Sequence, residues 1–104
     1  MSQNQFLSEQ LQKGLTVSWR PKGNSMTPII KSGQRVTVEP VTDPFSIKAG
    51  DVVFAKVRGS YYLHLVKRAT FTTGEPCKFL IGNNHGGING WTSKIFGKLV
   101  QVEP

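Results

Sequence analysis

The spacing of the apolar residues changes at Gly14. Before this position, Phe6, Leu7 and Leu11 recur with the spacing of a helix, and glycine commonly ends one, so we expect an N-terminal helix over residues 4–13. After Gly14, apolar and polar residues alternate, as in strands whose side chains point to opposite faces in turn. The pattern predicts a mainly β fold, a small antiparallel β domain with one short N-terminal helix.

Six segments are the predicted strands. In the first, Leu15, Val17 and Trp19 share one face, and in the second the pattern stops at Pro40. The stretch Arg-Gly-Ser between the third and fourth suits a hairpin with Gly59 in a left-handed conformation. The six segments are residues 15–19, 35–40, 51–57, 61–68, 78–82 and 98–104.

The stretch NNHGGINGW, residues 83–91, is rich in glycine and is predicted to be a loop between the last two of these strands. A glycine-rich loop that binds phosphate follows a strand and opens a helix. No helical pattern follows residues 83–91, so we exclude a phosphate-binding function for this loop.

The length of the chain limits its domain organisation. A chain of 104 residues can bury one core but not two, so we expect a single domain, helical over residues 1–14 and β over residues 15–104. No apolar run approaches the roughly 18 residues of a membrane helix, and the N-terminus lacks the pattern of a secretory signal. We therefore expect a soluble, cytoplasmic protein without a membrane anchor.

Cysteine and histidine are too few for common stabilising sites. A lone cysteine, Cys77, cannot form an internal disulfide, which agrees with a reducing compartment. Two histidines and one cysteine give no zinc-ligand spacing. We expect no metal and no cofactor.

Charge widens the range of partners to consider. The chain has 13 Lys and Arg against 6 Asp and Glu, a formal net charge of +7, which suits nucleic acid or an acidic membrane surface. However, the positive residues are scattered from Lys13 to Lys98, and the aromatic residues do not form the signature of an RNA-binding sheet. We interpret the charge as a basic surface that keeps the protein soluble, and do not expect nucleic acid as a partner.

Ser25 is the first candidate for chemistry. It lies in KGNSMTPIIKSG, residues 22–33, among turn-forming residues, so an ordinary turn serine is the simplest interpretation. A nucleophilic serine needs a base within hydrogen-bond reach and donors for the oxyanion. The candidate bases are His64, Lys67 and His85, together with the more scattered lysines.

Strand alternation separates two of these candidates. In the strand over residues 61–68, Leu63 and Leu65 are expected to pack into a core, which leaves the imidazole of His64 on the more open face. The same alternation places Lys67 with the leucines, on the face opposite His64.

The stretches GNSMTPIIKSGQRVTVEPV and KAGDVVFAKVRGSYYLHLVKR together resemble the serine peptidase superfamily of type I signal peptidases and SOS-type repressors. That family has a Ser-Met box, a Gly-Asp strand and a general base on the following strand. The likeness extends over residues 15–102. It implies a coiled antiparallel β domain and hydrolysis of a peptide bond in a protein or peptide substrate bound in extended form.

The resemblance assigns roles residue by residue. Ser25 matches the nucleophile, and His64, fourteen residues after Gly50, matches the base of the family's histidine-type members. The Ser25 N–H is implied as an oxyanion donor. Gly23 matches the small residue two before the nucleophile, and Met26 a core or substrate-pocket contact.

Lys67 is the alternative base, because LVKR is similar to the motif of lysine-type members. Choosing Lys67 requires the alignment with the family's base to shift by three residues. An odd shift would put the base on the other face of the sheet. We therefore favour His64 and expect Ser25 Oγ within about 4 Å of it. Activity is then expected to rise across about pH 6 to 8 as the imidazole loses its proton.

The sequence departs from the family at three positions. Leu65 stands where arginine usually follows the base, and Gln34 stands where aspartate is common. The late box offers Asn89, or failing that Asn84, where histidine-type members use aspartate to orient the base. An amide fixes the tautomer of an imidazole but does not stabilise the imidazolium as a carboxylate does.

Two functions therefore stay open. One is a serine peptidase that uses a Ser25/His64 dyad. The alternative is a catalytically weak or inactive member that acts as a protein-binding or regulatory module. Signal peptidases need a membrane anchor and SOS-type repressors carry a DNA-binding domain, so we expect a stand-alone catalytic domain with neither.

Overall fold

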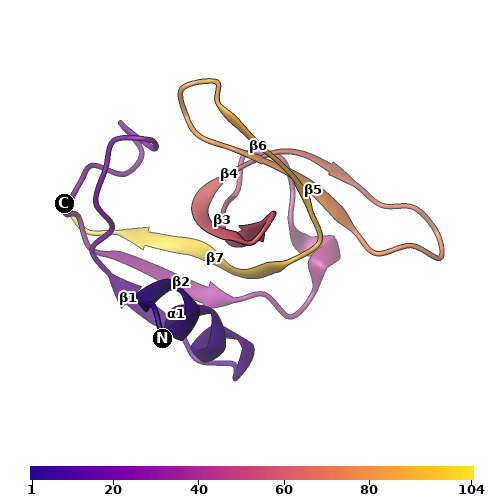
Figure 1. The fold of residues 1–104 in the computed structure, drawn as a ribbon, viewed down its shortest axis with the longest axis horizontal. Helices are drawn as coiled ribbons and strands as arrows, with labels where there is room; N and C mark the ends of the chain where they lie inside the picture. The colour runs from indigo at the N-terminus through magenta and orange to yellow at the C-terminus, as the bar shows by residue number, and fades with distance from the viewer.

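The computed structural model describes residues 1–104 and contains seven strands in one antiparallel sheet, one α-helix and one 3₁₀ helix (Figure 1). The strands lie in the order β1-β2-β7-β3-β4-β5-β6. The expected mainly β class with a short N-terminal helix is confirmed. In chain order the elements are α1 (Gln3–Gln12), β1 (Val17–Trp19), β2 (Val36–Pro40), η1 (Pro44–Ser46), β3 (Val52–Val57), β4 (Ser60–Thr70), β5 (Lys78–Gly82), β6 (Ile88–Thr92) and β7 (Ile95–Val102).

Helix α1 begins where its sequence provides a cap. The side chain of Ser2 accepts a hydrogen bond from the Gln5 N–H at 3.1 Å, which satisfies one of the free donors at the helix start. Leu7 and Leu11 are buried and pack in a cluster with the sheet residues Val38 and Phe54. The helix is thus held by one apolar side against the sheet (Figure 1).

Strand β4 bridges the two halves of the sheet. Its first half pairs with β3 through a tight two-residue turn, in which Arg58 and Gly59 have φ angles of 51° and 85°. Its second half pairs with β5, beginning at Leu65. Residues 60–64 therefore have a strand partner on the β3 side and none on the β5 side.

The expectation for residues 83–91 is wrong in its second half. Residues 83–87 form a loop, but Ile88–Thr92 form β6 and pair with β5. The glycines of this segment made its strand pattern unrecognisable in the sequence. Gly90 is buried with a φ of 138°, and a Cβ there would lie 3.2 Å from Val57 Cγ1. Close packing against the end of β3 therefore requires glycine at this position.

The sheet is covered on both faces. Residues 52–55 of β3 are all buried, although alternate side chains point to opposite faces. One face holds a cluster that includes Phe79 and Ile81, and the other holds Phe54. Cys77 is a free cysteine buried in the first cluster. The structure contains no helix with the length and apolar character needed to cross a membrane.

Candidate active site

The loop that carries Ser25 is anchored to the sheet by buried apolar side chains. Met26 and Ile30 are buried and pack against Val36 and Val52, while Ser25 itself is exposed. Met26 and Ile30 also line a cavity of about 40 Å³ beside Ser25. Burial of the neighbouring methionine thus holds the serine hydroxyl at the surface of the sheet.

Three side chains from distant segments form a hydrogen-bonded chain. Ser25 Oγ lies 3.1 Å from His64 Nε2, and His64 Nδ1 lies 2.7 Å from Asn89 Oδ1. Because an amide oxygen only accepts hydrogen bonds, the proton on the imidazole is on Nδ1. Nε2 is then free to accept the proton of the Ser25 hydroxyl, which is the arrangement that a general base requires.

His64 does not lie on an open face, so this part of the sequence prediction is wrong. His64 is only 9% exposed, because the Ser25 loop and β6 both cover it. The ring of Tyr62 also lies alongside, with the centroids 5.0 Å apart. The sheet is covered on both faces, so strand alternation alone does not identify a solvated side.

Burial lowers the pKa of His64 below its usual value of 6.5. The hydrogen bond with Asn89 acts in the opposite direction, and the charge of Lys67 lowers the pKa further. The imidazole therefore becomes neutral at a lower pH than an exposed histidine. A rise in activity with pH is accordingly expected to be centred below 6.5, and so below the middle of the window predicted from the sequence.

Lys67 forms no hydrogen bond with Ser25 or His64. It lies close to Gly82, where a Cβ would come within 2.9 Å of Lys67 Cε. Its influence on His64 was not expected, because alternation placed it on the opposite face. The pairing of β4 with β5 shifts between Val66 and Arg68, so the alternation does not continue through Lys67.

Asn84 has a different position from the one considered for it. Rather than orienting His64, it binds the Ser25 loop: its N–H donates to Ser25 O and its side-chain amide donates to Thr27 O, both at 2.9 Å. His85 Nε2 lies 2.9 Å from Asn24 O and 2.9 Å from Thr27 Oγ1. The loop after β5 therefore holds the serine loop by its backbone carbonyls.

The sequence did not indicate this contact between loops, since His85 was considered only as a base. Asn83 supports it, with its side-chain oxygen accepting from the N–H groups of His85 and Gly87, both at 2.8 Å. The sequence signal for this turn was the asparagine that follows Gly82, because asparagine side chains often hydrogen-bond to the backbone of a turn.

We expect His85→Leu to slow the chemistry of Ser25 by about 10- to 10²-fold, because small displacements of a reacting group are costly. His85→Gln is the matched control, since its amide can still donate a hydrogen bond to Asn24 O. The rate of labelling of Ser25 by a serine-directed reagent measures the effect. Equal rates in both variants and the wild type would show that the contact does not position the serine.

Two backbone N–H groups near Ser25 were expected to matter for an oxyanion site, and they differ in their hydrogen bonds. The Gly23 N–H donates to Ser32 Oγ at 3.0 Å and is not available to a substrate. The Ser25 N–H makes no hydrogen bond within the chain. Of the two residues that the resemblance suggested for this region, the Ser25 backbone is therefore the one able to donate to an oxyanion.

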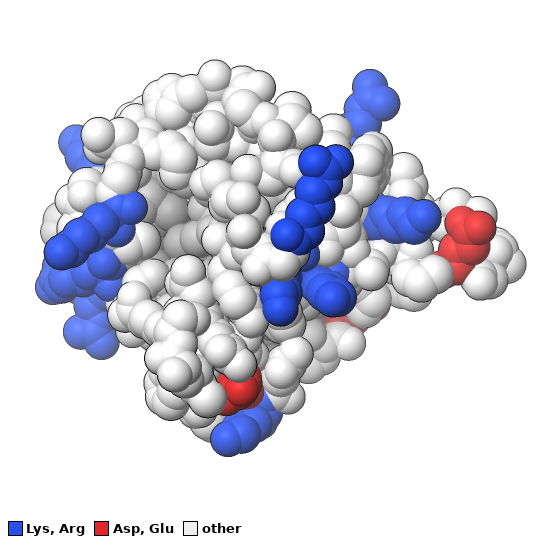
Figure 2. All heavy atoms as spheres, viewed as in Figure 1, with Lys and Arg blue, Asp and Glu red and all other residues white.

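A groove of about 660 Å³ leads to the dyad. It lies between the segment after β1 and the first half of β4, and Figure 2 shows Lys and Arg side chains gathered over that segment, beside a hollow in the surface. Aromatic and apolar side chains form much of its lining: Trp19, Phe54, Tyr61, Tyr62 and Leu63.

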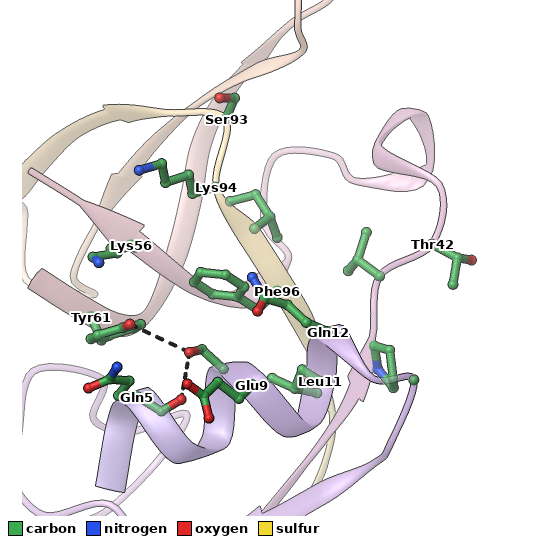
Figure 3. A pocket seen from close by; sticks show the side chains of 15 residues that line it. Gln5, Glu9, Leu11, Gln12, Thr42, Lys56, Tyr61, Ser93, Lys94 and Phe96 are labelled. Carbon is green, nitrogen blue, oxygen red and sulfur yellow. Dashed lines mark hydrogen bonds between the residues drawn. The ribbon is translucent and has the colours of Figure 1, made fainter. Parts of the chain in front are cut away.

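A second hollow, of about 640 Å³, lies between α1 and the start of β7 (Figure 3). Tyr61 lines both this hollow and the groove, and its hydroxyl lies 3.5 Å from Ser8 Oγ of the helix. Glu9, Lys56 and Lys94 give the hollow charges of both signs. It contains neither Ser25 nor His64.

No group of three or more His, Cys, Asp or Glu side chains could hold a metal ion. Neither the curated proteins nor the solved structures gave a match to this chain. A family model described as Peptidase S24-like matches residues 4–84, which include Ser25 and His64 and end before Asn89. Because this match spans more than half of the sequence and agrees with the predicted superfamily, the chain belongs to the Peptidase S24-like family.

Proposed function

We propose that this protein is a serine peptidase in which Ser25 is the nucleophile and His64 the general base. The observation that carries the proposal is the 3.1 Å contact between Ser25 Oγ and His64 Nε2, with Nε2 as the acceptor. Membership of a peptidase family supports it, and so does the lowered pKa of His64, which keeps the base neutral near pH 7.

The reaction follows from these positions. Ser25 Oγ attacks the carbonyl carbon of the substrate while its proton moves to His64 Nε2. The Ser25 N–H donates to the oxyanion that forms. The imidazolium then returns its proton to the leaving amine, and the C–N bond breaks. Water, deprotonated by the same Nε2, hydrolyses the acyl-enzyme and restores both groups.

The substrate is a protein segment in extended form. Residues 60–64 of β4 have no strand partner on the β5 side, so their free backbone groups can pair with an added strand. The groove runs along this half of β4 and ends at the dyad. A segment paired there would bring a carbonyl to Ser25.

Asn89 favours the second candidate function, a binding module. Its amide cannot form an ion pair with the imidazolium, so the transition state loses part of its stabilisation. A member of the fold with little activity would bind an extended segment in the same groove and not cut it. The two functions share the groove and differ only in the reactivity of Ser25.

A fluorophosphonate reagent that labels activated serines tests the proposal. We expect labelling of the wild type and none of Ser25→Ala. Ser93→Ala is the matched control, because Ser93 is exposed and its side chain has no hydrogen-bond partner. Full labelling of Ser25→Ala would show that Ser25 is not the nucleophile. Absence of labelling in every variant would favour the binding module.

A further inference from the structure

We propose that the groove selects segments with an acidic side chain, Asp or Glu, next to the residue that packs on its aromatic lining. The cleavage of such a segment rests on the proposed function, but its binding does not. Charge, the end of a helix and the nature of the lining point to the same class of substrate.

Two positive side chains lie in the groove without a counter-charge. Arg20 and Lys22 line it, close to Ser25 in the sequence, and none of its lining residues is Asp or Glu. The ion pair of the structure joins Lys98 and Asp51 and involves neither of them. Because a carboxylate is the natural partner of both, an acidic side chain would complete the groove.

Arg20 is held at the groove by a contact with the backbone. Its Nη1 donates to Gly33 O at 3.0 Å, which holds the guanidinium in place. A backbone carbonyl is neutral, so this bond leaves the positive charge uncompensated. The guanidinium has five N–H donors in total, and those not used by Gly33 remain for a carboxylate.

The start of α1 adds to the positive potential. Gln3 and Asn4 line the groove, and they are the first two residues of the helix. The first turn of α1 has no acidic residue to offset the positive end of the helix dipole. The effect is small by itself but has the same sign as the two side chains.

The lining strengthens these interactions. Trp19 lies edge-on to Phe54 at 5.4 Å between ring centroids, and Tyr62 lies against the imidazole of His64. A substrate side chain that covers these rings excludes water and lowers the local dielectric, which strengthens a neighbouring ion pair.

The second hollow provides a contrast. There Glu9 accompanies Lys56 and Lys94 and offsets part of their charge, whereas no acidic residue lines the groove (Figure 3). In Figure 2, no Asp or Glu appears among the positive side chains beside the groove. The preference for acidic segments is therefore a property of the groove and not only of the net charge of +7.

Binding is measured with Ser25→Ala protein, so that no cleavage interferes. The probes are fluorescein-labelled decapeptides with one tryptophan, and with Glu, Gln or Lys at each neighbouring position in turn. We expect the best Glu peptide to bind about tenfold more tightly than its Gln counterpart at 0.1 M salt, and the Lys peptide to bind most weakly.

Two double variants decide the origin of the preference. Replacing Arg20 and Lys22 by Gln is expected to reduce the Glu-to-Gln ratio to less than about twofold. Replacing Lys48 and Lys78 by Gln removes the same charge at exposed positions outside the groove and is expected to leave the ratio unchanged. Equal binding of Glu and Gln peptides, or an equal loss in both double variants, would overturn the proposal.

The outcomes separate this inference from the proposed function. Labelling of Ser25 without a preference for Glu would contradict the inference alone. Binding of Glu peptides by a protein whose Ser25 is never labelled would contradict the peptidase and support the groove as an acidic-segment binding site.

Discussion

Replacing His64 by alanine is expected to lower the rate of peptide hydrolysis by about 10²- to 10⁴-fold, the usual contribution of a general base. Its Nε2 is the only side-chain partner of Ser25 Oγ, at 3.1 Å, so no neighbouring group can take over the proton. The measurement is kcat/KM on a Glu-containing peptide, or the labelling rate of Ser25 where hydrolysis is too slow. Binding of the same peptide should change far less, because Arg20, Lys22 and the other groove residues remain in place.

Lys67→Gln is the comparison variant, because Lys67 is the alternative base. We expect its rate at high pH to match the wild type. The charge of Lys67 lowers the pKa of His64, so its removal raises that pKa and moves the rise in activity to higher pH. A loss in Lys67→Gln as large as that in His64→Ala would instead identify the lysine as the base.

The second large effect is expected at Asn89. Asn89→Leu removes the acceptor of the Nδ1 proton. The neutral imidazole can then adopt the tautomer with its proton on Nε2, and the ring is free to turn away from Ser25. A change of aspartate to asparagine in a serine peptidase of another fold, which traps the wrong tautomer, costs about 10⁴ in turnover. We expect a loss of about 10²- to 10⁴-fold for Asn89→Leu, measured as kcat at the pH optimum.

Asn89→Asp should have the opposite effect. A carboxylate accepts the same Nδ1 proton and also stabilises the imidazolium that forms during the reaction. It favours the charged imidazole, so the pKa of His64 rises and activity appears at higher pH. Above that pH, kcat should exceed the wild-type value. If neither Asn89 variant changes kcat or the pH profile, Asn89 is not the orienting residue.

The secondary structure was predictable because its signals are local. Helix α1 and the strands other than β6 follow from apolar spacing and turn residues, and the structure has each of them within a few residues of the predicted bounds. Strand β6 was missed because its glycine, Gly90, is selected by close packing against Val57, a contact that a local pattern does not reveal.

The candidate residues could also be named from the sequence, because motif spacing and family resemblance both mark Ser25 and His64. For the orienting residue, the resemblance suggested Asn89 first and Asn84 second. The choice between Asn89 and Asn84 depended on the packing of β6 and of the loop before it: Asn89 lies 2.7 Å from His64 Nδ1, and Asn84 binds the serine loop.

Only the tertiary structure decided the environment of His64, the proposed base. His64 is buried because a loop and a strand from distant parts of the chain meet over it, and burial is what lowers its pKa. The charge of Lys67 lowers that pKa further, and the pairing of β4 with β5 shifts beside this residue. Residue types and spacing are properties of the sequence, whereas burial and long-range electrostatics depend on which segments the folded chain brings together.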